Sequence, residues 1–121
     1  MQMTVTILGT DYIVRKEKYD EVSVFGGKGI VGYCDTVLKE IVYCDLRTHP
    51  VYEKDQAEFV RKSEQSALRH EIVHAFLAES GLRECSLTFE DGWATNEEMV
   101  DWIALQGEKI YSAWKVAGAL D

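Results

Sequence analysis

Features that would assign a protein to a membrane class are missing from this sequence of 121 residues. No apolar run approaches the roughly 20 residues that a transmembrane helix needs. Residues 1–14 contain several threonines and an aspartate, and they lack the basic start and apolar stretch of a signal peptide. We therefore expect a protein that neither spans a membrane nor carries a signal peptide.

Basic residues are also scarce, with 13 Lys and Arg against 21 Asp and Glu and a formal net charge of −8. No basic cluster is longer than Arg61-Lys62. Nucleic acids and anionic membrane surfaces both attract proteins through clustered Lys and Arg. We therefore expect no nucleic-acid partner and no membrane partner.

Cysteine is present only as Cys34, Cys44 and Cys85, an odd number without a C-x-x-C pair. Such a pattern offers no disulfide framework and is typical of a reducing compartment, so we expect the protein in the cytoplasm. The 46% hydrophobic content is sufficient to bury a core without disulfides in a chain of this length. We expect a single domain over residues 1–121.

The first half of the chain has the pattern of β-strands. Residues 4–8 and 12–16 are rich in β-branched and aromatic residues, and the turn sequence Gly9-Thr10-Asp11 between them predicts a hairpin. Residues 29–34 and 40–46 predict a second pair, and Val42, Cys44 and Leu46 alternate onto one face, which we expect to lie toward the helices. The glycine-rich residues 26–29 lack P-loop spacing and predict a flexible turn.

The second half predicts helices. One should begin between residues 53 and 63 and end at Gly81, a residue suited to the left-handed conformation that closes a helix. After a loop at 82–94, a second helix should start near residue 95. A last helix at 108–120 should pack against the other two through Ile110, Trp114 and Ala117. We expect all three tryptophans, Trp93, Trp102 and Trp114, in the core.

The helix that ends at Gly81 contains the pentapeptide His70-Glu71-Ile72-Val73-His74, an H-E-x-x-H motif. Two histidines four residues apart project from one helix face, so both imidazoles can bind a single tetrahedral Zn²⁺ ion. Glu71 is beside the pair, where a carboxylate can act as a general base on a water molecule without binding the metal. The motif predicts a zinc site.

The residues around the motif support this interpretation. The helix is apolar over most of its circumference, which predicts a buried central helix. Buried His and Glu side chains need partners, because an unpaired buried polar group costs roughly 1–3 kcal/mol. A metal ion would satisfy both rings. The apolar residues are Leu68, Ile72, Val73, Ala75, Phe76 and Leu77.

A candidate third ligand follows in Asn96-Glu97-Glu98-Met99-Val100-Asp101. The combination of H-E-x-x-H with N-E-x-x-x-D about twenty residues later resembles the gluzincin metallopeptidases over residues 66–106, and the short chain resembles their minimal single-domain form, the minigluzincins. The resemblance implies a zincin-like α+β fold, with a small antiparallel or mixed N-terminal sheet, then the active-site helix and C-terminal helices. It also implies His70, His74 and Glu97 as zinc ligands, Glu71 as base, and Asp101 as hydrogen-bond acceptor for a ligand histidine.

Glu98 competes with Glu97 as the third ligand because it is also acidic and directly adjacent. The sequence Thr95-Asn96-Glu97-Glu98 fits a capping box, with Thr95 as N-cap and Glu98 folded back to its backbone N–H. This arrangement would leave Glu97 available to the metal, so we favour Glu97.

The chain differs from the larger gluzincins in lacking a later histidine that could stabilise an oxyanion. His49 is the only histidine outside the motif, and its position next to Pro50 predicts an exposed loop. Tyr111 is a downstream candidate for this role, and Tyr33 and Tyr43 are candidates in the strand region. We expect a structural role for each of the three tyrosines.

The resemblance implies a zinc-dependent metallopeptidase that hydrolyses peptide bonds through a zinc-bound water activated by Glu71. An alternative is a zinc-binding but catalytically silent or latent domain that interacts with a protein, and another chain could complete or regulate its cleft. A third interpretation is a deformylase-like hydrolase with Cys34 or Cys44 as the third ligand, although the glycine-rich deformylase pattern is absent.

Overall fold

A four-stranded mixed sheet forms the first half of the chain in the computed structural model, which describes residues 2–83 and 92–120. Its strands are β1 (Gln2–Ile7), β2 (Thr10–Lys18), β3 (Gly32–Asp35) and β4 (Glu40–Asp45), in the order β1-β2-β4-β3. The outer pairs are antiparallel, and β2 pairs with β4 in parallel. The predicted α+β class, with an N-terminal sheet followed by helices, is confirmed.

The predicted hairpin forms, but its turn is shorter than expected. Ile7 pairs with Thr10, so the connection consists of Leu8 and Gly9 alone. Both have positive φ, 48° and 87°, as a two-residue hairpin turn of the primed type requires. Thr10 and Asp11 therefore belong to β2 and not to the turn.

The connection from β2 to β4 places β3 at the edge of the sheet. The chain passes through the short 3-10 helix Tyr19–Glu21 and α1 (Ser23–Gly27), runs along β3, and returns as β4 between β2 and β3. The predicted glycine-rich turn is partly helical, because Gly26 and Gly27 belong to α1. Gly29, with a φ of 66°, lies between α1 and β3.

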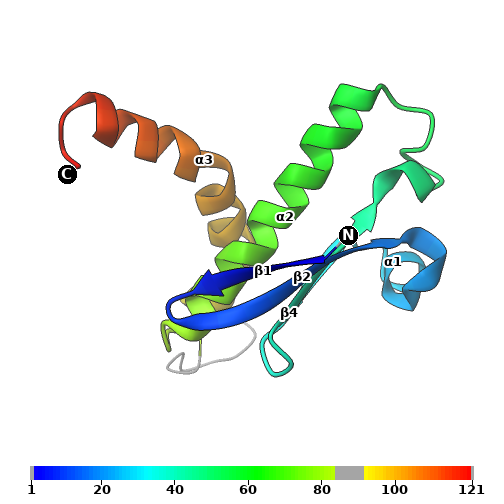
Figure 1. Cartoon of the computed structure of the whole chain (residues 1–121), viewed down its shortest axis with the longest axis horizontal. Coiled ribbons are helices and arrows are strands. Elements are labelled where there is room, and N and C mark those ends of the chain that lie inside the picture. Colours follow the sequence, from blue (N-terminus) through cyan, green and yellow to red (C-terminus); the bar gives the residue numbers. More distant parts are fainter. Residues whose placement is uncertain (1, 84–91, 121) are drawn as a thin grey trace.

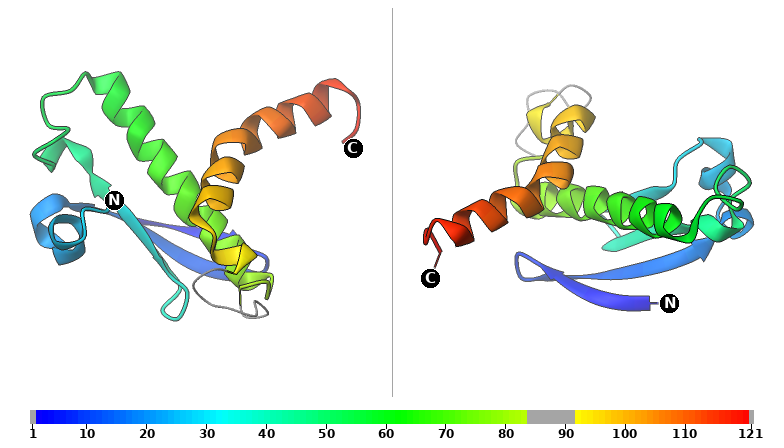
Figure 2. Two further views of the ribbon diagram at one scale, coloured as in Figure 1. Left: turned by 180° about the vertical axis from the view of Figure 1, so that it is seen from behind. Right: turned by 90° about the horizontal axis from the view of Figure 1, so that it is seen from above.

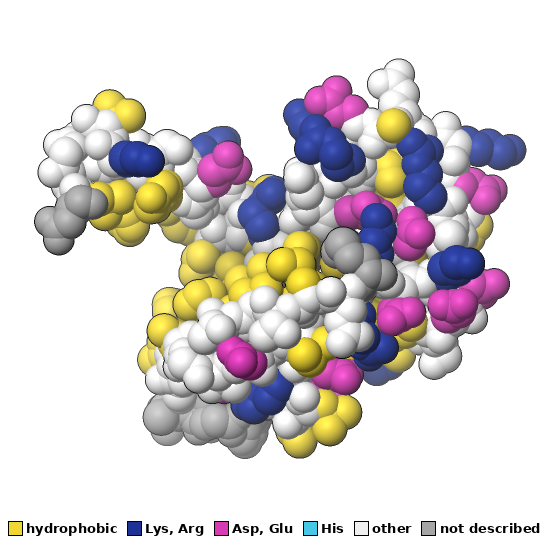
Figure 3. All heavy atoms as spheres, viewed as in Figure 1, with side chains coloured by type: hydrophobic (Ala, Val, Ile, Leu, Met, Phe, Trp, Pro, Cys, Tyr) yellow, Lys and Arg dark blue, Asp and Glu magenta, His cyan; other side chains and the backbone are white. Residues whose placement is uncertain are grey.

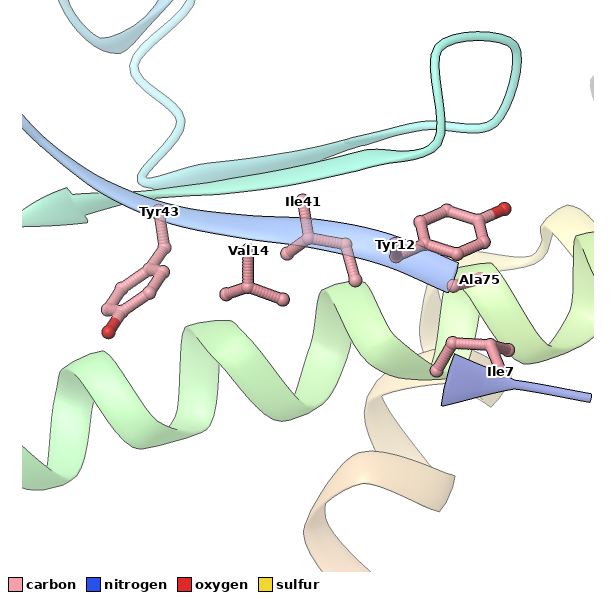
Figure 4. Close-up of a cluster of buried hydrophobic side chains, with 6 residues drawn as sticks. All are labelled: Ile7, Tyr12, Val14, Ile41, Tyr43 and Ala75. Carbon is pink, nitrogen blue, oxygen red and sulfur yellow. The ribbon is translucent and has the colours of Figure 1, made fainter. Parts of the chain in front are cut away.

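The core lies between the sheet and α2 (Ala57–Glu79), which crosses one sheet face (Figures 1 and 4). The residues of this cluster are Ile7, Tyr12, Val14, Ile41, Tyr43 and Ala75. The alternation in β4 is confirmed, and Val42, Cys44 and Leu46 do pack with helical residues, but the opposite face of the strand is the one that packs in the cluster with Ala75 of α2. Ile41 and Tyr43 face α2, whereas Val42, Cys44 and Leu46 pack with Phe25 of α1 and Val60 at the start of α2. A central strand is buried on both faces, so its sequence does not identify the α2 side.

The predicted limits of α2 are confirmed at both ends. The helix begins at Ala57, and Ser80 caps it before Gly81, which has a φ of 86°. His49, predicted in an exposed loop, is instead buried at 8% exposure. The rings of Tyr19 and Tyr52 contact it edge-on, and its Nδ1 accepts a hydrogen bond from the Val51 N–H.

The C-terminal part differs most from the prediction. A single helix, α3 (Glu97–Val116), follows the 3-10 turn Trp93–Thr95 and replaces the two expected helices. It diverges from α2, so its C-terminal half projects from the rest of the molecule (Figures 1 and 2). The expected packing of residues 108–120 and the buried tryptophans are therefore both wrong. Trp93, Trp102 and Trp114 are 59%, 57% and 52% exposed.

No helix in residues 2–83 and 92–120 is long and apolar enough to cross a membrane. The predicted loop at 82–94 lies largely outside the described residues, as does Cys85.

Truncation of the fully buried Ile41 tests the core between the sheet and α2. We expect Ile41→Ala to lower the free energy of unfolding by about 2–5 kcal/mol, because it removes packed methyl groups and leaves a cavity. Val37→Ala, at a position that is 85% exposed, is the matched control and should change it by less than about 0.5 kcal/mol. Urea unfolding followed by circular dichroism measures both. Equal effects would show that Ile41 is not part of a packed core.

Candidate metal centre

His70, Glu71 and His74 of α2 form a group that could hold a metal ion, with one potential ligand atom from each lying within 4.8 Å of the others. The two histidines are one helical turn apart, and their Nε2 atoms are 3.1 Å apart. Both rings are partly buried, and burial lowers the pKa of His74, which favours its neutral form. Neutral imidazole is the form of histidine that binds metals.

Glu97, at the first position of α3, contacts both histidines. Its Oε2 lies 3.1 Å from Nε2 of His70, and its Oε1 lies 2.9 Å from Nε2 of His74. Two contacts with α2 position the start of α3. Val100 packs in a buried cluster with Leu77, and the Ala104 carbonyl accepts a hydrogen bond from Nε of Arg69.

These distances fit a tetrahedral metal ion. A zinc ion bound at about 2.0–2.1 Å to each ligand would separate the ligand atoms by about 3.3 Å along each edge of the tetrahedron. The three separations among His70, His74 and Glu97 are 2.9, 3.1 and 3.1 Å. A small outward movement of each side chain would accommodate the ion, so the donor set fits zinc in both type and spacing.

Asp101 contacts the other nitrogen of His70, with 2.6 Å between Oδ1 and Nδ1. Because an ionised carboxylate can only accept a hydrogen bond, this contact places the ring proton on Nδ1. In the neutral ring Nε2 then carries the lone pair that a metal ion would bind, and Nε2 is the atom that faces His74 and Glu97. Glu97 and Asp101 are four residues apart on α3, so one helix face supplies both contacts.

The predicted capping box is wrong. Asn96 is the N-cap of α3, and its side chain accepts a hydrogen bond from the Met99 N–H at 2.9 Å. Thr95 belongs to the preceding 3-10 turn, where its hydroxyl donates to the Gly92 carbonyl. Asn is as good an N-cap as Thr, so the sequence is equally compatible with an N-cap at Asn96, one residue later than predicted. Glu98 lines a separate groove beside Trp102 and Leu105.

Glu71 is next to the histidines and is only 8% exposed. Burial, reinforced by the carboxylates of Glu97 and Asp101 and opposed by His70, raises the pKa of Glu71 to about 7. Gly32 in β3 makes room for this side chain. A Cβ at that position would lie 3.3 Å from Cγ of Glu71. This close approach was not predictable from the sequence, because it joins residues from two distant elements.

A cleft of about 860 Å³ surrounds these side chains. One wall is residues 29–34, which include most of the edge strand β3, and the opposite wall contains His70, Glu71, His74, Glu97 and Asp101. Arg83 is the only Lys or Arg among the described residues that line it. Its Nη1 donates to the Thr36 hydroxyl at 3.0 Å.

The three tyrosines considered as oxyanion donors occupy different environments. Tyr33 lines the cleft, Tyr43 packs in the core against α2, and Tyr111 is exposed on the projecting half of α3. The prediction that Tyr43 is structural is supported by its burial. Tyr52, which the sequence did not single out, also lines the cleft. Its loop precedes α2 by only a few residues, but no local pattern relates it to the motif.

The described cysteines are poor candidates for the third ligand. Cys34 lines the cleft, but burial and the nearby carboxylate of Glu71 raise the pKa of its thiol to about 12. Cys44 is buried in the α1 cluster, and burial raises its pKa to about 11. Metals bind the thiolate, which both environments disfavour. Neither sulfur belongs to the group of potential ligand atoms that includes His70.

No protein-family model, curated protein or solved structure matches this chain. The structure itself shows a mixed sheet that precedes the helices, and a His-Glu-His group on α2 with a geometry like that of an H-E-x-x-H motif.

The raised pKa of Glu71 predicts a pH-dependent cost to folding. In the unfolded chain this carboxyl loses its proton near its ordinary pKa of 4.5, whereas in the folded protein it keeps it until about pH 7. Between these values the unfolded state binds fewer protons, so stability falls as pH rises and then stays level above pH 7. Glu71→Gln should remove this loss.

Chemical unfolding of wild type and Glu71→Gln, both in excess chelator, measures the effect. We expect the difference in the free energy of unfolding between Glu71→Gln and wild type to shift in favour of the variant by about 1–3 kcal/mol from pH 4.5 to pH 8. A stability difference that does not change with pH would contradict the burial of an ionisable carboxyl at this position.

Proposed function

We propose that this chain is a zinc-dependent metallopeptidase whose zinc ion is held by His70, His74 and Glu97. The observation that carries the proposal is the convergence of two imidazole nitrogens and one carboxylate, from two different helices, to within 2.9–3.1 Å of one another. Two histidines and one glutamate with an open fourth position are typical of catalytic zinc sites. Structural zinc sites more often use four protein ligands.

The buried carboxylate of Glu71 supplies the acid–base chemistry. Bound zinc would polarise a substrate carbonyl and lower the pKa of a water molecule toward about 7. Glu71 would accept the proton that this water loses and donate it to the leaving nitrogen. The raised pKa of Glu71, about 7 in the metal-free protein, supports this role, because a proton carrier must adopt its protonated form transiently. Asp101 would hold His70 in the tautomer that leaves Nε2 free.

The cleft wall supports a peptide as substrate. β3 pairs with β4 on one side only, so its other edge is not paired within the described sheet. An extended peptide can hydrogen-bond to such an edge as an additional strand. Gly32, opposite Glu71, lies in this strand, which would bring a bound peptide close to the proposed base. On the cysteine pattern we propose that the substrate is cytoplasmic.

A second candidate function is a zinc-binding domain that recognises a protein without cleaving it. The observation that favours it is the exposure of one side of the centre: the side chains of Glu97 and Asp101 are 66% and 61% exposed. Another chain could cover these carboxylates and thereby complete or regulate the cleft. The two candidates share the metal ligands and differ in whether Glu71 supports turnover.

Substitution of the third ligand tests the metal centre. We expect wild type to retain about one zinc ion per chain after dialysis against a mild chelator, and Glu97→Ala to retain little, because its two remaining imidazoles bind zinc too weakly. Elemental mass spectrometry measures the ratio. Glu98→Ala is the matched control, because its carboxylate lies outside the cleft, and it should retain zinc as wild type does. Loss of zinc in Glu98→Ala alone would transfer the ligand role to Glu98.

Substitution of Glu71 tests catalysis separately from metal binding. We expect Glu71→Gln to keep its zinc and to lose peptide cleavage by at least about 100-fold, as expected for loss of a general base. A library of fluorogenic peptides and casein, each with and without added zinc, provides the assay. Cleavage by the variant at the wild-type rate would contradict the role of Glu71. Zinc retention without cleavage by wild type would favour the binding domain.

A further inference from the structure

An apolar stripe runs along the whole of α3. It follows a heptad pattern in which the side chains recur at intervals of three and four residues and share one face. The members are Val100, Ile103, Ala104, Gly107, Ile110, Tyr111 and Trp114. Val100 and Ala104 in the first half are buried. The same face should therefore be suited to packing along the second half.

The second half of the stripe is exposed because α3 diverges from α2. Tyr111 and Trp114 are 54% and 52% exposed, and Figures 1 and 2 show that this end of α3 lies away from both the sheet and α2. Figure 3 shows hydrophobic side chains gathered along one side of the projecting segment. A continuous apolar face of this kind marks an interaction surface, unlike a single exposed apolar residue.

The charges beside the stripe indicate which partner fits. Glu108 and Lys115 are seven residues apart, so they flank the exposed stripe on the same side of the helix. Neither forms an ion pair within the part of the chain that the structure describes. If a second copy of α3 packs antiparallel about a twofold axis between residues 111 and 112, Glu108 of each copy faces Lys115 of the other.

We propose that the projecting half of α3 is a homodimer interface, in which two copies pack antiparallel about this axis. In the same register Val116, the last residue of α3, lies at the same level along the helix axis as Gly107 of the second copy. The paired segment is thus residues 107–116, which begins just after Ala104, the last buried residue of α3. The dimer covers the exposed half of the stripe and leaves the contact with α2 unchanged.

Gly107 gives this interface a recess. A Cβ at Gly107 would meet no other atom of the described residues within 4 Å, apart from its chain neighbours and the nearby backbone of α3, so the space beside this glycine is open. In the antiparallel register, Trp114 of the second copy lies between Gly107 and Ile110. An indole ring needs such a space, and aromatic side chains dominate the energetics of small interfaces. The inference is independent of the proposed enzymatic function.

The dimer should be weak. Two helical segments of ten residues bury less surface than the 1,200–2,000 Å² that is typical of stable interfaces, and each copy carries a formal net charge of −8. We expect a monomer–dimer equilibrium with a dissociation constant on the order of micromolar to hundreds of micromolar. Sedimentation velocity from about 5 µM to about 500 µM covers this range.

Trp114→Ala tests the apolar contact. We expect it to raise the dissociation constant at least tenfold, consistent with the loss of a central aromatic anchor. Val37→Ala is the control, because Val37 is also an exposed apolar residue but lies in the turn between β3 and β4. It should dimerise as wild type does. Circular dichroism at low concentration checks that each variant keeps its helix content.

A charge exchange tests the antiparallel register. Glu108→Lys places like charges together in both symmetric pairs and should weaken the dimer about three- to tenfold. The double variant Glu108→Lys with Lys115→Glu restores opposite charges and should restore wild-type dimerisation. A parallel dimer would place Glu108 against Glu108 and Lys115 against Lys115. Glu108→Lys would then exchange one pair of like charges for another and would leave the dissociation constant nearly unchanged, which would contradict the antiparallel register. A wild-type monomer up to 500 µM, or failure of the double variant to recover, would overturn the proposal.

Discussion

The contact between the start of α3 and the second half of α2 is the interaction on which the candidate site depends. α2 alone presents His70, Glu71 and His74. Glu97 and Asp101 reach them because the start of α3 is held against α2, through the packing of Val100 with Leu77 and the hydrogen bond from Arg69 to Ala104. The sheet in turn fixes α2 through the cluster that contains Ile41 and Ala75. The candidate metal centre is therefore a product of tertiary packing between elements about twenty residues apart in the sequence.

The electrostatics of the centre follow from this packing. Three carboxylates, from Glu71, Glu97 and Asp101, lie around two histidines, and their mutual repulsion contributes to the raised pKa of Glu71. A divalent cation between the imidazoles and Glu97 would offset this repulsion and favour the ionised form of Glu71. The same arrangement that disfavours charge in the metal-free protein therefore favours the binding of a cation.

The sequence predicted what local spacing controls. The separation of four residues in His70 and His74, and again in Glu97 and Asp101, determines a shared helix face regardless of tertiary context. The hairpin, the α2 limits and Gly81 followed from similar local patterns. Features set by contacts between distant elements were missed, including the close approach of Gly32 to Glu71 and the burial of His49 between two tyrosines. The apolar heptads of α3 predicted packing, but the divergence of α3 from α2 leaves its second half without a partner inside the chain.

X-ray absorption at the zinc edge of the zinc-loaded protein tests the central claim most directly, because it reports the atoms that bind the metal. Our account predicts four nitrogen or oxygen neighbours at about 2.0–2.2 Å, with the outer-shell pattern of two imidazole rings. A sulfur neighbour at about 2.3 Å would show a cysteine ligand, and a spectrum without imidazole scattering would exclude His70 and His74. Either result would contradict the metal centre described above.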